Sequence, residues 1–237
     1  MHMTIKIPFD RRAGIGLSIV EMLVGIAIGL FILAGATLVV TEQLGDNRRL
    51  LLETQVQQDL RSTADLIARD VRRAGYWGSA ASSVWINSGA TTVNPYPSIS
   101  SAPGAGGRSD ELLYTWSAAD ESNVENDTLN AAEQFGFALN VTSGVIEMKL
   151  GGAGWQALTD SNVLRVTQFN VTPNPQTVAL PCAKPCPVGL ANCPPQQLVR
   201  QLVVELVGEA VHDSRVRRSV RAEVKLRNDG VSGSCPA

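Results

Sequence analysis

A long apolar segment near the N-terminus constrains this chain more than any other feature. Leu17 to Val40 is a run of 24 residues in which Glu21 is the only ionisable side chain. An α-helix rises about 1.5 Å per residue, so such a run extends for roughly 36 Å and exceeds the roughly 30 Å hydrocarbon core of a bilayer. The sequence therefore predicts a membrane-spanning helix over residues 17–40.

Basic residues before the apolar run predict its orientation. Lys6, Arg11 and Arg12 outweigh Asp10, which gives this flank a local charge of +2. Basic flanks of membrane-spanning helices remain on the cytoplasmic side. We therefore expect a single-pass membrane protein with its N-terminus in the cytoplasm and its body on the opposite side of the membrane.

Three interpretations of the apolar run compete. A secretory signal peptide would be cut after the A-x-A-like sequence Ala34–Gly35–Ala36, and a plain signal anchor would stay uncut. Neither explains Glu21, because a carboxylate inside the membrane costs about 3 kcal/mol on insertion scales. An acid near the end of the run could also reach the interface, but ionisable residues within membranes are normally functional. The third interpretation gives Glu21 a role.

The sequence "RRAGIG" followed by "LSIVEMLVG" resembles the class III signal of type IV pilins and pseudopilins. In that family a prepilin peptidase cuts after a glycine, the new N-terminal residue is methylated, and a glutamate stands fifth in the mature chain. The resemblance implies a leader of residues 1–16, a cut between Gly16 and Leu17, and N-methylation of Leu17. A cut after Gly14 would place Glu21 seventh. Many members begin with Phe rather than Leu, and Leu38 stands where major pilins have a kinking proline.

Charge pairing and small residues make this interpretation physically coherent. Cleavage creates an α-ammonium group in or beside the membrane, and a buried carboxylate needs such a partner. Glu21 would pair with the amine of a neighbouring subunit and set the axial register. Gly25 and Gly29 form a GxxxG pair, which allows helix backbones to approach closely in lipid.

The helical pattern continues beyond the membrane as an amphipathic segment over residues 41–75, with a C-cap at Gly75. Its predicted buried face consists of Leu44, Leu52, Val56, Leu60, Ile67, Val71 and Ala74. We interpret Arg69, Asp70, Arg72 and Arg73 as a solvated face, with subunit docking as the alternative. Tyr76 and Trp77 are expected to anchor the helix end in the core.

Two further stretches narrow the resemblance. Residues 64–78 are similar to the end of this helix in PilW-type minor pilins, and residues 217–228 are similar to their final strand. The implied fold class is α+β and pilin-like: one long N-terminal helix, half of it membrane-spanning and half amphipathic, packed on an antiparallel β-sheet.

The body, residues 76–237, reads as mostly β-structure. Strands are predicted at 111–116, 135–141, 146–150, 162–171, 201–209 and 220–227, with a hairpin around "TSG". Residues 201–209 could also form a helix, but their β-branched content and shortness favour a strand. Residues 79–110 are expected to be irregular, and the acidic segment with Asp120, Glu121, Glu125 and Asp127 fits a solvated loop better than a calcium site.

All four cysteines, Cys182, Cys186, Cys193 and Cys235, lie in the last quarter of the chain. Their spacing is poor for a zinc site, and in an exported body disulfides are expected. Three pairings are open, and each ties the C-terminal tail to the Pro-rich segment around 181–195.

Enzyme motifs are missing from the sequence. His212 could act as a catalytic base, but the sequence contains no G-x-S-x-G motif that would supply a nucleophile. No phosphate-binding or dinucleotide-binding loop occurs either. With a net charge of −2, nucleic-acid binding is not predicted either, and we expect no cofactor, no metal and no catalytic residue.

The resemblance implies a minor pilin that joins a priming or tip complex of a type IV pilus by helix packing. Its expected partners are other minor pilins, the major pilin, the prepilin peptidase, the assembly platform and a tip adhesin. Two alternatives stay open: a minor pseudopilin of a type II secretion system, and a membrane-anchored periplasmic enzyme or binding protein.

Overall fold

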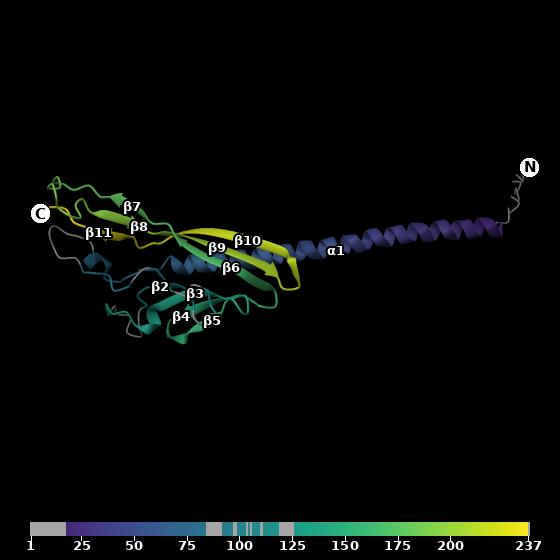
Figure 1. Cartoon of the computed structure of the whole chain (residues 1–237), viewed down its shortest axis with the longest axis horizontal. Coiled ribbons are helices and arrows are strands. Elements are labelled where there is room, and N and C mark those ends of the chain that lie inside the picture. The colour runs from purple at the N-terminus through teal and green to yellow at the C-terminus, as the bar shows by residue number, and fades with distance from the viewer. Residues whose placement is uncertain are drawn as a thin grey trace, which may run out of the picture. The chain divides into compact units, whose positions relative to one another are not determined.

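A computed structural model describes residues 18–83, 92–96, 99–102, 104, 106–109, 111–118 and 126–236 (Figure 1). The chain divides into two compact units, residues 1–49 and 50–237. The helix α1 (Ile19–Val71, 53 residues) is continuous across both. The fold class is the predicted one, with one long apolar N-terminal helix and an antiparallel β-sheet body.

Helix α1 ends three residues before the predicted end at Ala74. Residues 72–75 form turns. The last of them, Gly75, has a φ of 72°, a left-handed conformation that glycine adopts without penalty. The N–H of Gly75 donates to the carbonyl of Thr115 at 2.7 Å rather than to the helix. Gly75 therefore directs the chain away from the helix axis, as a C-cap glycine does.

The second half of α1 carries the predicted apolar stripe. Leu52 is partly buried, and five residues of the stripe are at most 1% exposed: Val56, Leu60, Ile67, Val71 and Ala74. Leu44, which the pattern also placed on this face, is instead 56% exposed. The spacing was right, but the described part of the first unit has no sheet against which Leu44 could pack.

A five-stranded antiparallel sheet forms one layer of the second unit. Its order is β1 (Ser100–Ala102), β2 (Glu111–Thr115), β3 (Gln134–Asn140), β4 (Val145–Leu150) and β5 (Trp155–Ala157). The predicted hairpin is confirmed as β3 and β4, with Gly144 at a φ of 70° in its turn. Val141 was expected in the strand but lies exposed in this turn. Short 3-10 helices occupy Ala80–Ser83, Ala131–Glu133 and Gly151–Ala153.

A three-stranded ribbon forms the other layer and continues into a second small sheet. The order β10 (Asp213–Lys225), β9 (Gln201–Ala210), β6 (Leu164–Pro173) is repeated as β11 (Gly230–Ser232), β8 (Gln196–Val199), β7 (Gln176–Ala179). The segment "QLVVELVGE" is thus a strand, as its β-branched content indicated. Figure 1 shows the small sheet at the end of the ribbon where the C-terminus lies.

Between the ribbon and the small sheet, the outer strand is longer than the strand beside it, and the extra residues contact the end of α1. Five residue steps from Lys225 to Gly230 lie opposite three steps from Gln201 to Leu198, so the outer strand carries two extra residues. This bulge caps the end of α1. The N–H of Arg227 donates to the carbonyl of Arg72 at 3.1 Å, and Asn228 Nδ2 donates to that of Ala74 at 3.1 Å.

One hydrophobic core joins the two layers to the helix. The second half of α1 lies between the ribbon and the five-stranded sheet (Figure 1). The sheet contributes Leu112, Tyr114, Phe137, Leu139 and Ile146, and the ribbon contributes Leu164, Val166, Phe169, Leu202, Val204, Leu206, Ala210, Val216 and Val224. The body is therefore held together by contacts that converge on one helix face.

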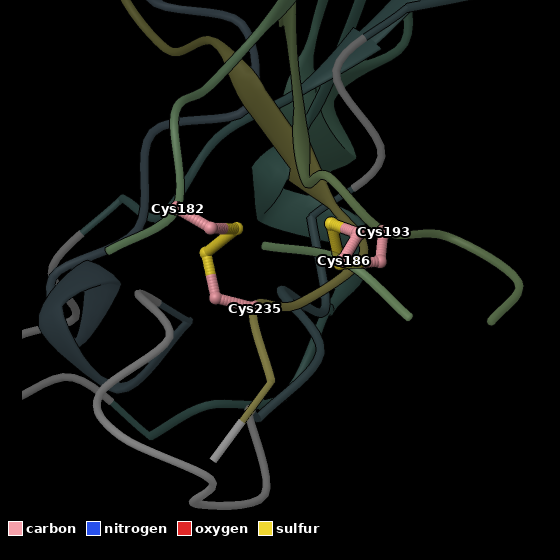
Figure 2. Close-up of a disulfide and its surroundings, with 4 residues drawn as sticks. All are labelled: Cys182, Cys186, Cys193 and Cys235. Atoms are coloured by element: carbon pink, nitrogen blue, oxygen red, sulfur yellow. A yellow bond between two sulfur atoms is a disulfide. The ribbon is translucent and has the colours of Figure 1, made fainter. Parts of the chain in front are cut away.

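Two disulfides lie side by side at the end of the ribbon (Figure 2). Cys182 pairs with Cys235 across a sequence separation of 53, and Cys186 pairs with Cys193 across a separation of 7. The first bond ties the C-terminal tail to the loop between β7 and β8. The small sheet exposes all four residues of β7, so these cross-links replace a core of its own.

The two disulfides should differ in their contribution to stability. In the chain-entropy model, closing the longer loop contributes about 4 kcal/mol and closing the shorter one about 2.5 kcal/mol. We expect the double substitution Cys182→Ala and Cys235→Ala to lower the free energy of unfolding more than Cys186→Ala and Cys193→Ala. Urea unfolding of the full chain in detergent measures both. Equal losses would contradict the loop-length account.

Candidate assembly site

The first half of α1 presents apolar side chains that the rest of the described chain does not cover. Every residue from Ser18 to Leu51 is exposed, and Phe31 reaches 83% and Ile19 79%. By length and composition this helix is able to cross a membrane. A surface so large and apolar requires lipid or other helices around it.

Glu21 lies in the first turn of this helix, among exposed apolar residues. A helix N-terminus carries a partial positive charge, which favours a carboxylate there. No described side chain forms an ion pair with Glu21. The two residues of the predicted cleavage site, Gly16 and Leu17, lie outside the described residues, so the cut and the methylation stay predictions.

Gly25 and Gly29 are open to an approaching helix. No atom lies within 4 Å of the place where a Cβ would stand on either residue, apart from their own helix neighbours. The two glycines are four residues apart on one side of α1, as are Glu21 and Gly25. This side therefore combines one carboxylate with a smooth backbone surface, the combination that close helix packing in lipid uses.

The body holds its half of the helix through a buried polar contact as well as through the core. Asp70 was interpreted as part of a solvated face, but it is only 9% exposed and accepts a hydrogen bond from the Tyr114 hydroxyl. Arg73 lies 3.6 Å from the same carboxylate and stacks over Trp116. Arg69 and Arg72 are exposed, as predicted. Val71 of the apolar stripe therefore lies in the core, and the adjacent Asp70 is bonded to a side chain of the sheet.

Burial raises the pKa of the Tyr114 hydroxyl well above its usual range, and the charge and hydrogen bond of Asp70 add to this effect. Arg73 acts in the opposite direction. Tyr114 is therefore a neutral donor to the carboxylate throughout the physiological range. Aromatic stacking with Phe135 and Phe137 fixes the position of its ring.

A second ion pair lies near the start of the buried half of α1. The carboxylate of Glu53 accepts a hydrogen bond from the Arg218 side chain of β10. Just after the same strand, the N–H of Arg227 donates to the carbonyl of Arg72 at the helix end. Strand β10 thus follows the helix from one end of the unit to the other.

The other sequence candidates do not form a site in the described residues. His212 is exposed in the turn between β9 and β10. Asp120, Glu121 and Glu125 lie outside the described residues, and Asp127 accepts from Trp77 Nε1. The sulfurs of Cys182, Cys186 and Cys193 lie within 4.8 Å of one another, but each belongs to a disulfide and is not a thiolate ligand.

The predicted aromatic anchor is half right. Trp77 is 2% exposed and belongs to the core, whereas Tyr76 is 49% exposed. The turn after α1 directs the two adjacent side chains to opposite sides, so only one can be buried. Spacing along the helix did not reveal this, because the helix has already ended at Val71.

Comparison with known proteins agrees with this geometry. The model of the family described as prepilin peptidase-dependent protein B, PpdB, matches residues 49–226. The chain belongs to this family. It is a pilin-like protein that depends on prepilin peptidase, a structural kind of protein. No curated protein and no solved structure matches it.

The PpdB match begins after the apolar run, at residue 49. It therefore does not draw on Glu21, on the glycine pair or on the leader. The body and the N-terminal sequence point to the same kind of protein from separate residues.

The Tyr114–Asp70 contact predicts a specific dependence of stability on pH. We expect Tyr114→Phe to lower the free energy of unfolding by about 2 kcal/mol at neutral pH, because a hydrogen bond to a buried carboxylate is lost. In the native protein the raised pKa keeps Tyr114 neutral, while the unfolded chain ionises above its usual pKa of about 10. The stability from this tyrosine is therefore complete below about pH 10 and declines above it.

Urea unfolding of the native protein and of Tyr114→Phe between pH 8 and 11 measures the difference in their free energies of unfolding. The gap between the native protein and Tyr114→Phe should narrow above about pH 10. Tyr76→Phe serves as the control, because Tyr76 is half exposed and has little to lose. A gap that is constant with pH would contradict a buried neutral tyrosine.

Proposed function

We propose that this protein is a minor pilin of the type IV pilus, similar to the PilW type, and that it joins a priming or tip complex that starts pilus assembly. The observation that carries the proposal is the uncovered apolar half of α1 with one carboxylate in its first turn, on a chain of the PpdB family. The apolar side chains of such a helix can be covered by lipid or by other helices of the same kind.

The proposed mechanism is physical rather than chemical. The precursor waits in the inner membrane with its body in the periplasm, and the prepilin peptidase cuts after Gly16. The amine of the new first residue, Leu17, and the carboxylate of Glu21 are both costly in lipid when alone. Pairing Glu21 with the amine of a neighbouring subunit removes both costs and sets the axial register.

Close packing would then complete the contact. Gly25 and Gly29 leave room for a neighbouring backbone, so that dispersion contacts form along the helix. The partners we propose are other minor pilins, the major pilin, the assembly platform and a tip adhesin. The body stays outside this contact, because its core needs only residues from about position 52 onward.

The N-terminus of the mature protein tests the cleavage step. We expect intact-mass and N-terminal analysis of the protein purified from membranes to show a chain that starts with N-methyl-Leu17. A chain that starts at Thr37, after Ala34–Gly35–Ala36, would identify a secretory signal peptide. That result would end the assembly proposal, because the carboxylate and both glycines would be gone.

Replacing the carboxylate tests the pairing step. We expect Glu21→Ala to be cut and to remain in the membrane, but to reach the sheared fibre fraction at least about tenfold less often, because the neighbour's amine is left unpaired in lipid. Immunoblots of the two fractions measure this ratio. Glu42→Ala, an exposed acid of the same helix beyond the apolar run, is the matched control and should assemble normally. Normal incorporation of Glu21→Ala would remove charge pairing from the mechanism.

A further inference from the structure

Two sections of the long edge formed by β6 and β7 have outward backbone donors. The N–H of Asn174 donates inward to Gln201, and the N–H of Leu180 donates inward to Pro195. In an antiparallel pair every second residue bonds to the partner strand, and the residues between point their N–H and C=O away from it. With the register unbroken from Gln168 to Ala179, the outward positions include Phe169 and Val171 in β6, and Thr177 and Ala179 in β7.

Prolines occupy the other outward positions of this edge. Pro173, Pro175 and Pro181 stand where an N–H would point outward, so each removes a donor that another strand could use. The opposite edge of the ribbon, β10, carries Arg215, Arg217, Arg221 and Lys225. Prolines and charges are the usual means by which proteins prevent unwanted strand pairing. Neither a proline nor a charge stands at the outward positions Phe169 and Val171 of β6, nor at Thr177 and Ala179 of β7. We call Phe169 and Val171 the unguarded section of β6.

An apolar groove lies beside this unguarded section. Its volume is about 280 Å³, and it lies between β6 and β1, the edge strand of the five-stranded sheet. Ile99, Leu112, Phe169 and Val171 provide its apolar lining. A smaller cavity of about 150 Å³ shares Ile99 and Pro173 with it and continues to the break of the ribbon.

The ends of this groove carry opposite charges. Glu111 lines the larger cavity, and no ion pair joins it to another described residue. Arg200 lines the smaller cavity. Its Nη1 lies 3.3 Å from the carbonyl of Asn228, and its charge is attracted to the nearby carboxylate of Asp229. A ligand along the groove therefore meets a negative side chain at one end, apolar side chains in the middle and a positive side chain at the other end.

We propose that this groove binds an extended segment of a partner subunit, which adds to β6 as a further strand. The occupant hydrogen-bonds to the backbone of Phe169 and Val171, places alternate apolar side chains in the groove, and carries a basic residue toward Glu111 and an acidic one toward Arg200. The identity of the occupant as a segment of another pilin-like subunit rests on the proposed function. The recognition of an extended peptide by the groove does not depend on that function.

A synthetic peptide tests the recognition directly. The probe is a fluorescein-labelled octapeptide, Lys-Val-Thr-Val-Thr-Val-Thr-Asp, capped at both ends, and its anisotropy is titrated with the full chain in detergent. We expect saturable binding. The same peptide N-methylated at alternate amides on one edge should bind about tenfold more weakly, because it loses the backbone hydrogen bonds but keeps its side chains.

Two proline substitutions separate the groove from the rest of the edge. Val171→Pro removes the outward donor without touching the ladder to β9, and it should weaken binding about tenfold. Thr177→Pro makes the same change in β7, away from the groove, and should leave binding unchanged. Glu111→Lys should weaken the binding of the probe peptide. A peptide with Glu in place of its Lys should bind to that variant and so restore the interaction.

Two results would overturn the proposal: no saturable binding of the probe, or equal binding of the N-methylated peptide, which would show apolar adsorption only. If Val171→Pro fails to fold, the N-methylated peptide and the charge swap still decide. The proposed function is judged separately, because N-methyl-Leu17 and fibre incorporation are measured without the peptide.

Discussion

A helix surface with no cover from the rest of its own described chain is the constraint on which this molecule depends. From Ser18 to Leu51 the helix buries nothing, and from Val56 onward the same helix supplies one side of the core. Burial of apolar surface drives folding, so the first half must find its cover elsewhere. Lipid or neighbouring helices can supply it. In the proposed function Glu21 makes the two unequal, because only a neighbouring subunit would offer a charged partner.

The body is built to hold the other half of that helix firmly. Apolar packing alone would let a helix slide or rotate, whereas Asp70 with Tyr114 and the bulge at Asn228 fix it at defined atoms. Asn228 lies in the stretch that contains the two extra residues of the ribbon, and its side chain donates to the carbonyl of Ala74. Hydrogen bonds are directional, so they fix the position of the helix more specifically than dispersion contacts do.

The sequence predicted those features that a simple period encodes. The stripe of α1, the β3–β4 hairpin and the alternation in β9 and β10 were all readable, because burial on one face imposes a period. The sequence did not predict the burial of Asp70, the exposure of Tyr76 or the repeated strand order of the ribbon. These depend on contacts between residues far apart in the chain, such as Tyr114 with Asp70, and no local pattern records them. Glu21 was conspicuous in the sequence for the opposite reason: ionisable residues are rare within an apolar membrane-spanning run, so a single one is informative.

The two halves of the chain carry different kinds of information. An apolar helix with a carboxylate and two glycines is suited to packing against any helix of similar design, so it can provide attachment but little choice of neighbour. Choice of partner requires features that differ between subunits. The body offers such a feature in the strand edge at Phe169 and Val171, beside a groove lined by Glu111 that continues to Arg200. Opposite charges at fixed positions reject wrong partners more than they strengthen the right one. In the proposed function, the helix therefore places the subunit in the assembly and the groove determines which subunit it adjoins.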